Sequence, residues 1–313
     1  MAKKQNILFP PRIFPVYKPR GIHSGDVLKH FKRNLPEGFG KIGHLGTLDP
    51  FAEGLFLIAV GQAARLSFLF ELYCYKTYNA IGRLHEKSDT GDCDGNISRI
   101  EPRILPDRDV LIKITGDLTG EYWQAPPYYS AAKHEGKPLY DYARHGIYID
   151  KPKVKREVID IREVDYCDNK SKLKFTSEVS SGTYIRTLFE DIAISLGTLG
   201  HLEYLQRTKI GPVGIDCAMH KSVWPIEGKC FDVIKMSICP SRFFQFPKFS
   251  VNEDLYHRLE NGQRVPLNYL DNDVKCLPYA WLVNDEGMLR GLFEVNSGII
   301  KAKVMFPKLV VDR

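Results

Sequence analysis

The pattern of hydrophobic and polar positions along the first third of the chain predicts strands separated by short helices. A short strand over residues 13–19 ends in a Lys-Pro turn, and apolar residues at helical spacing then predict a helix capped by Ser24. The run over 55–60 is continuously apolar, which is typical of a strand covered on both faces. A further strand is predicted over 76–84.

The middle of the chain changes character twice. Residues 85–110 are acidic and rich in turn formers, so we predict a loop there, followed by a helical stretch near 107–115. Two alternating segments, "VKREVIDIREVDYCD" and "SKLKFTSEVSSGTYIR", predict neighbouring strands. A helix ended by Gly197 follows them.

The C-terminal part is predicted to be a separate β unit. Composition shifts around 240–250, and beyond it "YAWLVNDEGMLRGLFEV" predicts a hairpin and "GIIKAKVMF" another strand. We therefore divide the chain into a larger unit over 1–245 and a small one over 246–313.

Composition is that of a globular protein, with 43% hydrophobic and 26% charged residues in 313. No stretch approaches the roughly 20 apolar residues of a membrane helix, and the apolar stretch near the N-terminus is too short for a signal peptide, so we expect a cytoplasmic protein with no membrane association. Seven scattered cysteines without a C-x-x-C pair indicate reduced thiols. The net charge of +6 is compatible with a nucleic-acid partner and does not require one.

The stretch "GKIGHLGTLDPFAEGL", residues 40–55, places a carboxylate beside a buried strand. Asp49 followed by proline is typical of a helix cap, but Gly54 and the strand after it leave no helix to cap. Two interpretations remain open at this point. Asp49 is either a turn former or a functional carboxylate in a loop whose glycines let the backbone approach a ligand.

Other candidate sites are weaker. Residues 90–101 nearly match a calcium loop, but Thr90 replaces its first aspartate and the flanking helices are missing, which favours a solvated acidic turn. Histidines and cysteines show no metal-ligand spacing, and no phosphate-cradle, dinucleotide or serine-nucleophile motif occurs, so we expect neither a metal nor a cofactor. Tyr184 and Arg186, two residues apart, are predicted to share one strand face. They and Tyr78 fit a solvated surface, or a ring that stacks on a flat ligand beside a pairing guanidinium.

Taken together, these segments resemble the bacterial tRNA pseudouridine synthases of the TruB type. The similar segments run in the same order from about 13 to 212: "YKPRGIHSGDVL", "GHLGTLDPFAEGLFLIAVG", "KTYNAIGRLHEKSDTGDCDG", "QAPPYYSAAKHEGKPLYDYARHG", "SSGTYIRTLFEDI" and "HLEYLQRTKIG". The last 65 or so residues are similar in position and strand pattern to the family's small RNA-binding PUA domain. The resemblance implies an α+β fold, with a mixed, largely antiparallel sheet flanked by helices and a small C-terminal β-barrel.

The resemblance also implies roles for particular residues. Asp49 falls on the catalytic aspartate, Tyr78 on the tyrosine that stacks on the target base, and Arg186 on the arginine that pairs with the aspartate. The implied substrate-binding residues are Tyr184 at the active site, Leu205 in the pocket lining, His44 in the RNA loop, and Lys18 and Pro19 as supports of the site's edge.

The implied activity is isomerisation of a uridine in the T loop of tRNA, at position 55, to pseudouridine, without a cofactor. The expected partner is the tRNA T arm, with no obligatory protein partner, and we expect a monomer. Two alternatives stay open: a guide-RNA-dependent pseudouridine synthase, and an RNA-binding protein that has kept the fold without the chemistry. Leu45 and Glu53 depart from the family pattern, which usually has Thr at the first position and often at the second.

Overall fold

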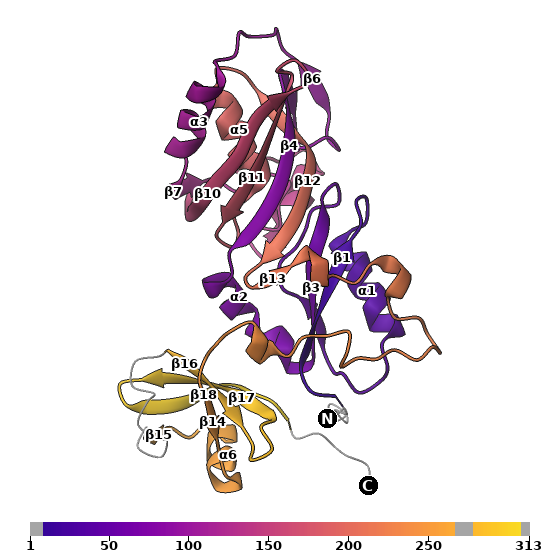
Figure 1. Ribbon diagram of the computed structural model, residues 1–313, viewed down its shortest axis with the longest axis vertical. Helices are drawn as coiled ribbons and strands as arrows, with labels where there is room; N and C mark the ends of the chain where they lie inside the picture. The colour runs from indigo at the N-terminus through magenta and orange to yellow at the C-terminus, as the bar shows by residue number, and fades with distance from the viewer. Residues whose placement is uncertain (1–8, 267–277, 308–313) are drawn as a thin grey trace.

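The computed structural model describes residues 9–266 and 278–307. The N-terminal apolar stretch considered for a signal peptide and Cys276 lie largely or wholly outside the described residues. Within them the chain forms one large sheet with helices packed against it and a second, smaller sheet at one end of the molecule (Figure 1).

Nine strands form the large sheet. Its main path runs through β1 (Arg12–Lys18), β3 (Glu53–Val60), β12 (Gly200–Ile210), β4 (Lys76–Leu84), β11 (Lys172–Val179), β10 (Val154–Cys167) and β7 (Gly120–Gln124). Beside this path, β2 (Ile42–His44) pairs with β3, and β13 (Val213–Gly214) pairs with β12. Among these described strands β3 and β12 pair in parallel and the others antiparallel, which confirms the mixed, largely antiparallel sheet.

Helix α5 (Ile185–Ser195) packs closely on the large sheet because a strand position beneath it is glycine. A Cβ on Gly82 would lie 2.0 Å from the Phe189 ring, so glycine in β4 lets α5 (Ile185–Ser195) pack closely. The described residues before 246 also form α1 (Ser24–Asn34), the 3-10 helix Gly61–Leu66 with α2 (Ser67–Tyr73) directly after it, α3 (Arg108–Asp117) and α4 (Leu139–Ala143), with short 3-10 turns at Ile215–Cys217, Lys221–Val223 and Pro240–Arg242.

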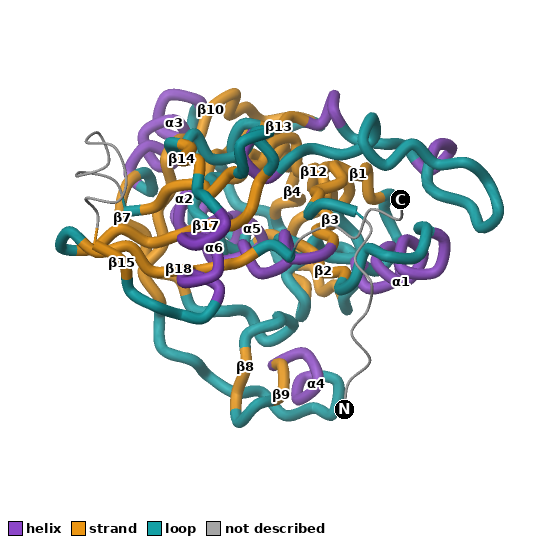
Figure 2. The backbone as a smooth tube through the Cα atoms, turned by 90° about the horizontal axis from the view of Figure 1, so that it is seen from below, coloured by secondary structure: helices purple, strands orange, loops and turns teal. Residues whose placement is uncertain are grey.

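Two small hairpins branch from the large sheet. The first, β5 (Glu86–Ser88) with β6 (Ile97–Arg99), lies within the segment predicted as an acidic loop. The second, β8 (Lys133–His134) with β9 (Lys137–Pro138), projects with α4 from one side of the molecule (Figure 2).

The smaller sheet has five strands in the order β14 (Lys248–Ser250), β16 (Tyr279–Val283), β17 (Leu289–Asn296), β18 (Ile299–Met305) and β15 (Val265–Pro266). The helix α6 (Glu253–Glu260) precedes β15, and the Asn252 side chain caps it by accepting from the Leu255 amide at 2.9 Å. The predicted C-terminal β unit is therefore confirmed as part of the fold, and its sheet is consistent with a PUA-like domain.

An aromatic cluster joins the two sheets. Phe70 on α2 packs against Phe243 and Phe244 with ring centroids 5.0 Å apart in each pair. Trp281 on β16 is fully buried in the same core cluster and donates from Nε1 to the Phe244 carbonyl at 3.1 Å. Large apolar side chains from both sheets thus form one continuous core.

The predicted cap of the first helix is wrong by one residue. His23 is the N-cap of α1, and Ser24 is its first residue. The hydroxyl of Ser24 is used elsewhere, in contact with the loop that carries Asp49.

Across the described residues, no helix combines the length and the apolar character that crossing a membrane requires.

Candidate active site

The loop between β2 and β3 carries Asp49 and is fixed by hydrogen bonds from a buried lysine. Lys18 is fully buried at the end of β1, and its Nζ donates to the carbonyls of Pro19 at 3.0 Å, Ile22 at 2.8 Å and Pro50 at 3.3 Å. Burial lowers the pKa of Lys18 to about 8, although the nearby Asp49 carboxylate opposes that shift. The ammonium therefore ties the turn after Asp49 to the end of β1.

Ser24 fixes the other side of the same turn. Its Oγ donates to the Leu48 carbonyl at 2.6 Å and accepts from the Leu48 amide at 3.1 Å. Both backbone groups of the residue before Asp49 are thus paired by one hydroxyl.

Ser24→Ala is expected to destabilise the protein by about 1–3 kcal/mol, because it leaves the two buried Leu48 groups unpaired. Turnover should also fall roughly ten- to a hundredfold, since Leu48 directly precedes Asp49 and small displacements of the carboxylate that the family resemblance implies to be catalytic are costly. Urea unfolding and single-turnover rates measure the two effects, with the exposed Ser98→Ala as control. Unchanged turnover in Ser24→Ala would contradict a positioning role.

Arg207 supports the glycine-rich part of the loop. Its fully buried guanidinium donates to the carbonyls of Leu55 at 2.7 Å, Thr47 at 3.1 Å and Gly46 at 3.3 Å. A Cβ on Gly54, whose φ is +107°, would lie only 2.4 Å from the Arg207 carbonyl oxygen. Glycine is therefore required at 54 for the close approach of the two strands.

Tyr184 and Arg186 are not on a strand, which corrects the prediction from their spacing. Tyr184 is the N-cap of α5, and Arg186 lies in the helix's first turn. The Gln124 side chain holds the start of the helix, accepting from the Tyr184 amide at 2.8 Å and donating to its carbonyl at 2.9 Å.

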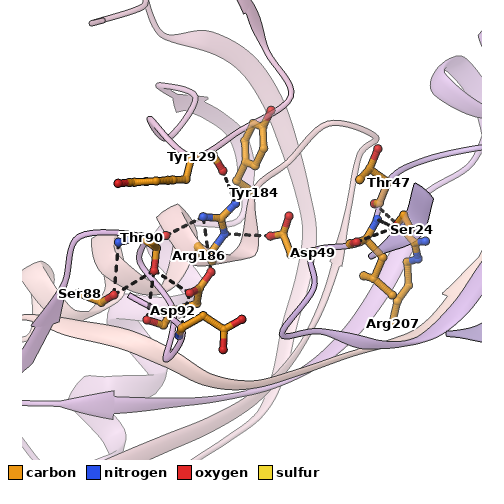
Figure 3. Close-up of polar contacts among 12 residues, drawn as sticks. Ser24, Thr47, Asp49, Ser88, Thr90, Asp92, Tyr129, Tyr184, Arg186 and Arg207 are labelled. Atoms are coloured by element: carbon orange, nitrogen blue, oxygen red, sulfur yellow. Dashed lines mark hydrogen bonds and ion pairs between the residues drawn. The ribbon is translucent and has the colours of Figure 1, made fainter. Parts of the chain in front are cut away.

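Arg186 meets Asp49 across the site, and the two residues point toward one another (Figure 3). The Arg186 Nε lies 2.9 Å from Asp49 Oδ2, and its Nη1 lies 3.6 Å from Asp92 Oδ2. The guanidinium also donates to the carbonyls of Thr90 at 2.6 Å and Tyr129 at 2.9 Å. Its side chain is only 4% exposed whereas that of Asp49 is 34% exposed, so the carboxylate is the accessible member of the ion pair.

Asp92 lies in the turn predicted as a solvated acidic loop, yet it is only 6% exposed. Its Oδ1 accepts from Thr90 Oγ1 at 2.6 Å and from the Asp94 amide at 3.1 Å. Burial raises the pKa of the Asp92 carboxyl, against these hydrogen bonds and the charge of Arg186. Thr90 and Asp92 in this turn thus hold the Arg186 guanidinium in place.

Glu190 lies behind this group, one turn after Arg186 on α5 and against Gly91, where an added Cβ would be 2.9 Å from its Oε1. Burial raises the pKa of Glu190 to about 7, with the charge of Arg186 opposing and that of Asp191 adding to the shift. Between pH 4.5 and 7 the folded state therefore holds a proton that the unfolded state has lost, and stability falls as the pH rises through this window.

Glu190→Gln is accordingly expected to raise the free energy of unfolding at pH 8 by on the order of 1–3 kcal/mol. The gain should shrink as the pH falls from about 7 toward 4.5, because the wild-type side chain is then neutral in the folded state. Urea unfolding at pH 5 and pH 8 measures this difference, and the exposed Glu37→Gln serves as control. A gain of equal size at both pH values would contradict the titration of Glu190.

The strand register brings the predicted tyrosine and leucine together. Tyr78 on β4 is opposite Arg207 on β12, and Leu205 is opposite Ala80, so their side chains share one face of the sheet. Tyr78 is 6% and Leu205 4% exposed. Both side chains belong to one hydrophobic core cluster, which also contains Leu48, the residue directly before Asp49.

His44 ends β2 and packs its ring against Phe56, with centroids 5.6 Å apart. Its Nδ1 is buried without a hydrogen-bond partner in the part of the chain that the structure describes. Burial lowers the pKa of His44, and the charges of Arg207 and Lys76 lower it further, so its imidazole is neutral at neutral pH.

Glu53, which differs from the residue that the family often has at this position, is hydrogen-bonded by two neighbouring side chains. Its carboxylate accepts from the Tyr204 hydroxyl at 2.9 Å and from Gln206 Nε2 at 3.3 Å. These charge-assisted hydrogen bonds hold the Glu53 side chain against β12. The other departure, Leu45, is buried and belongs to the core cluster on the other face of β3.

Sequence reasoning missed the residues that hold the site: Ser24, Asp92, Gln124 and Arg207. For Arg207 a signal existed, because it is two positions after Leu205 and alternation places both on the same face. A charged residue at a core-facing position is uncommon and indicates a specific partner. Among residues 9–266 and 278–307 the structure has no group of three or more His, Cys, Asp or Glu side chains that could hold a metal ion.

Comparison with solved structures gives the class of fold. The chain is similar to that in "Crystal Structure of a Cbf5-Nop10-Gar1 Complex", with a TM-score of 0.66 and 22% identity over 95% of this chain and 84% of that one. A second match, "Structure of H/ACA RNP bound to a substrate RNA containing 2'-deoxyuridine", has a TM-score of 0.65 and 20% identity, covering 96% of this chain and 86% of that one. At these identities the likeness concerns the fold alone.

Sequence comparison is more specific. Residues 32–185 match the model of the TruB family pseudouridylate synthase (N terminal domain). The chain is 34% identical to tRNA pseudouridine synthase B of Psychrobacter cryohalolentis over 82% of this chain and 71% of the relative. It is 39% identical to tRNA pseudouridine synthase B of Bordetella avium over 64% of this chain and 82% of the relative. The chain therefore belongs to the TruB family of pseudouridylate synthases.

Proposed function

We propose that this protein converts a uridine of tRNA, at position 55 in the T loop, into pseudouridine, with Asp49 as the catalytic residue. The observation that carries the proposal is the accessible Asp49 carboxylate, 2.9 Å from a buried guanidinium that holds it at the end of a braced loop. The substrate and position follow the names of relatives that are 34–39% identical and the colinear motifs.

The reaction breaks the bond between ribose C1′ and uracil N1 and forms a bond between C1′ and C5. The uracil rotates in between, N1 gains a proton, and C5 loses one, so no atom or electron is exchanged with a cofactor. Arg186 pairs with the Asp49 carboxylate and orients it, and this carboxylate acts as nucleophile or as base toward the ribose. A deuterium label at C2′ separates these roles, because only the base mechanism toward C2′ gives a primary isotope effect on turnover.

The uridine must leave the stacked loop before this chemistry, at a cost of a few kcal/mol. Stacking on an aromatic ring contributes about 1–3 kcal/mol per base, and Tyr78 is placed for that role on the sheet face beside Leu205. His44 fills the position that the base leaves. Tyr184 contacts the nucleotide from the start of α5, and Lys18 and Pro19 hold the edge of the loop.

We further propose that residues 1–245 form the catalytic unit and residues 246–313 an RNA-binding unit, and that the protein acts as a monomer without an obligatory protein partner. The basic residues of the C-terminal sheet support RNA contact there, with Lys248 on β14 and Lys301 and Lys303 on β18. The solved structures with a similar fold are complexes with further proteins, which makes dependence on partners a direct alternative to test.

The deciding experiment incubates the purified protein alone with an unmodified tRNA transcript and maps pseudouridine by chemical probing and primer extension. Modification at position 55 without guide RNA or other proteins supports the proposal. A transcript with cytidine at that position is the control. Modification elsewhere would reject the position, modification only with a guide RNA would reject the stand-alone mode, and tight binding without any product would leave an RNA-binding protein.

A further inference from the structure

Two buried cations lie under the Asp49 loop without an anionic partner among the described residues. Arg207 is fully buried and Lys76 is 9% exposed. The Lys76 Nζ lies 3.1 Å from the position of a Cβ built on Gly46, and Arg207 Nη1 lies 3.8 Å from it, so both charges flank the same point of the loop. Arg207 donates to backbone carbonyls, whereas no hydrogen bond or ion pair joins Lys76 Nζ to residues 9–266 or 278–307.

Such an arrangement is costly in the protein alone. Burial and, to a smaller extent, the charge of Arg207 lower the pKa of Lys76 to about 8, and Cys74 and Glu71 oppose the shift. A buried charge without a counter-charge destabilises the folded protein, so a ligand that supplies the missing negative charge would be bound favourably. Asp49 does not serve as the counter-charge, because it is paired with Arg186.

Lys76 belongs to the face of the sheet that the substrate must approach. It lies two residues before Tyr78 on β4, and alternation places both side chains on one face. His44, whose buried Nδ1 also has no partner in the described structure, is close enough for the Lys76 charge to lower its pKa. Two hydrogen-bonding groups without protein partners thus lie near each other, and one of them, Lys76, shares a sheet face with Tyr78, the residue proposed to stack on the uracil.

We propose that Lys76, with His44 beside it, binds a backbone phosphate of the substrate RNA next to the extruded uridine. This inference rests on the proposed function. A phosphate neutralises the excess positive charge of Lys76 and Arg207, which a carbonyl of the base would not do, and lysine binds phosphate as a point charge. Gly46 presents no side chain on this path, so the RNA backbone approaches the loop closely.

The first test compares Lys76→Met with Lys174→Met for binding to a T-arm stem-loop at several salt concentrations, both in the Asp49→Asn background so that binding is measured without turnover. Lys174 is exposed on β11 opposite Ile81, on the other face of the sheet. Lys76→Met should weaken binding about tenfold and reduce the slope of log Kd against log salt by about 0.7–0.9, the value for one phosphate contact. Lys174→Met should change neither quantity. An unchanged slope in Lys76→Met would overturn the proposal.

The second test removes the charge from the RNA and does not depend on the folding of a variant. Stem-loops with a single methylphosphonate at each phosphate near the target uridine are bound to the protein with Lys76 intact and to Lys76→Met. One position should weaken binding to the intact protein about tenfold and have no further effect on Lys76→Met. Additive losses at every position would reject the contact. Pseudouridine formation by the wild-type protein is measured separately, so a failure of the proposed function is distinguished from a failure of the phosphate site.

Discussion

Asp49→Asn is expected to abolish pseudouridine formation, with a loss of at least about 10²–10⁴ in the single-turnover rate, and to leave tRNA affinity within a few-fold of wild type. The amide retains the shape of the carboxylate but has neither its charge nor its basicity. Lys18 and Ser24 hold the loop through backbone atoms of Pro50 and Leu48, so the substitution leaves the braces intact. Release of tritium from C5-labelled uridine in tRNA measures the rate, and filter binding measures the affinity.

Asp109→Asn, an exposed change in the first turn of α3, is the matched control and should leave turnover unchanged. Appreciable product from Asp49→Asn would remove Asp49 from the chemistry and leave its contact with Arg186 as a structural ion pair. Weak binding together with lost turnover would place Asp49 in recognition of the RNA instead.

Changes at Arg186 should have the second-largest effect. Arg186→Ala leaves Asp92 buried without its cation, which is expected to cost about 3–5 kcal/mol of stability, and turnover should fall by at least about a hundredfold. Arg186→Lys should fold but remain about a hundredfold slower, because an ammonium cannot reach Asp49, Asp92 and the two carbonyls in the geometry of a guanidinium.

A double variant separates the two roles of this arginine. Arg186→Met with Asp92→Asn removes both buried charges, so stability should recover most of what Arg186→Ala loses, while turnover stays low. Arg162→Met, which breaks an exposed pair with Asp160, is the control and should affect neither quantity. Recovery of turnover together with stability would show that Arg186 supports only the fold.

The sequence correctly predicted the strands in which the pattern of apolar residues is regular along the whole element. The strand over 76–84 has the predicted bounds, and the apolar run at 55–60 lies within β3 because both its faces are covered. Gly197, with φ at +77°, follows the end of α5 as predicted. The bounds of these elements are set by residues close to one another in the sequence, so the local pattern of residue types is enough to predict them.

The start of α5 could not be read from spacing. Tyr184 and Arg186 are two residues apart, which fits either a strand or the first turn of a helix. The turn at Ser181 and Gly182, where φ reaches +83°, ends β11 at Val179 before the tyrosine. Tertiary contacts then decide the outcome, since Gln124 binds both backbone groups of Tyr184 from a strand sixty residues away.

The candidate site shows the same division. Asp49, Tyr78 and Arg186 were predicted from their resemblance to a family, and the structure brings Asp49 and Arg186 into contact. The residues that brace the loop bind main-chain carbonyls, and such contacts leave no pattern in the sequence because any residue can supply a carbonyl. The bracing roles of Ser24 and Arg207 therefore follow only from the three-dimensional structure.

The aromatic cluster formed by Phe70, Phe243, Phe244 and Trp281 has a practical consequence for dissecting the molecule. A chain cut before β14 would keep Phe243 and Phe244 on Phe70 but remove Trp281 from the same cluster, and an uncovered apolar surface of this kind promotes aggregation. Loss of activity in such a fragment would then report insolubility rather than a missing RNA contact. Charge substitutions at Lys248, Lys301 and Lys303 in the intact chain measure what the C-terminal sheet contributes to RNA binding, because they leave the aromatic cluster covered.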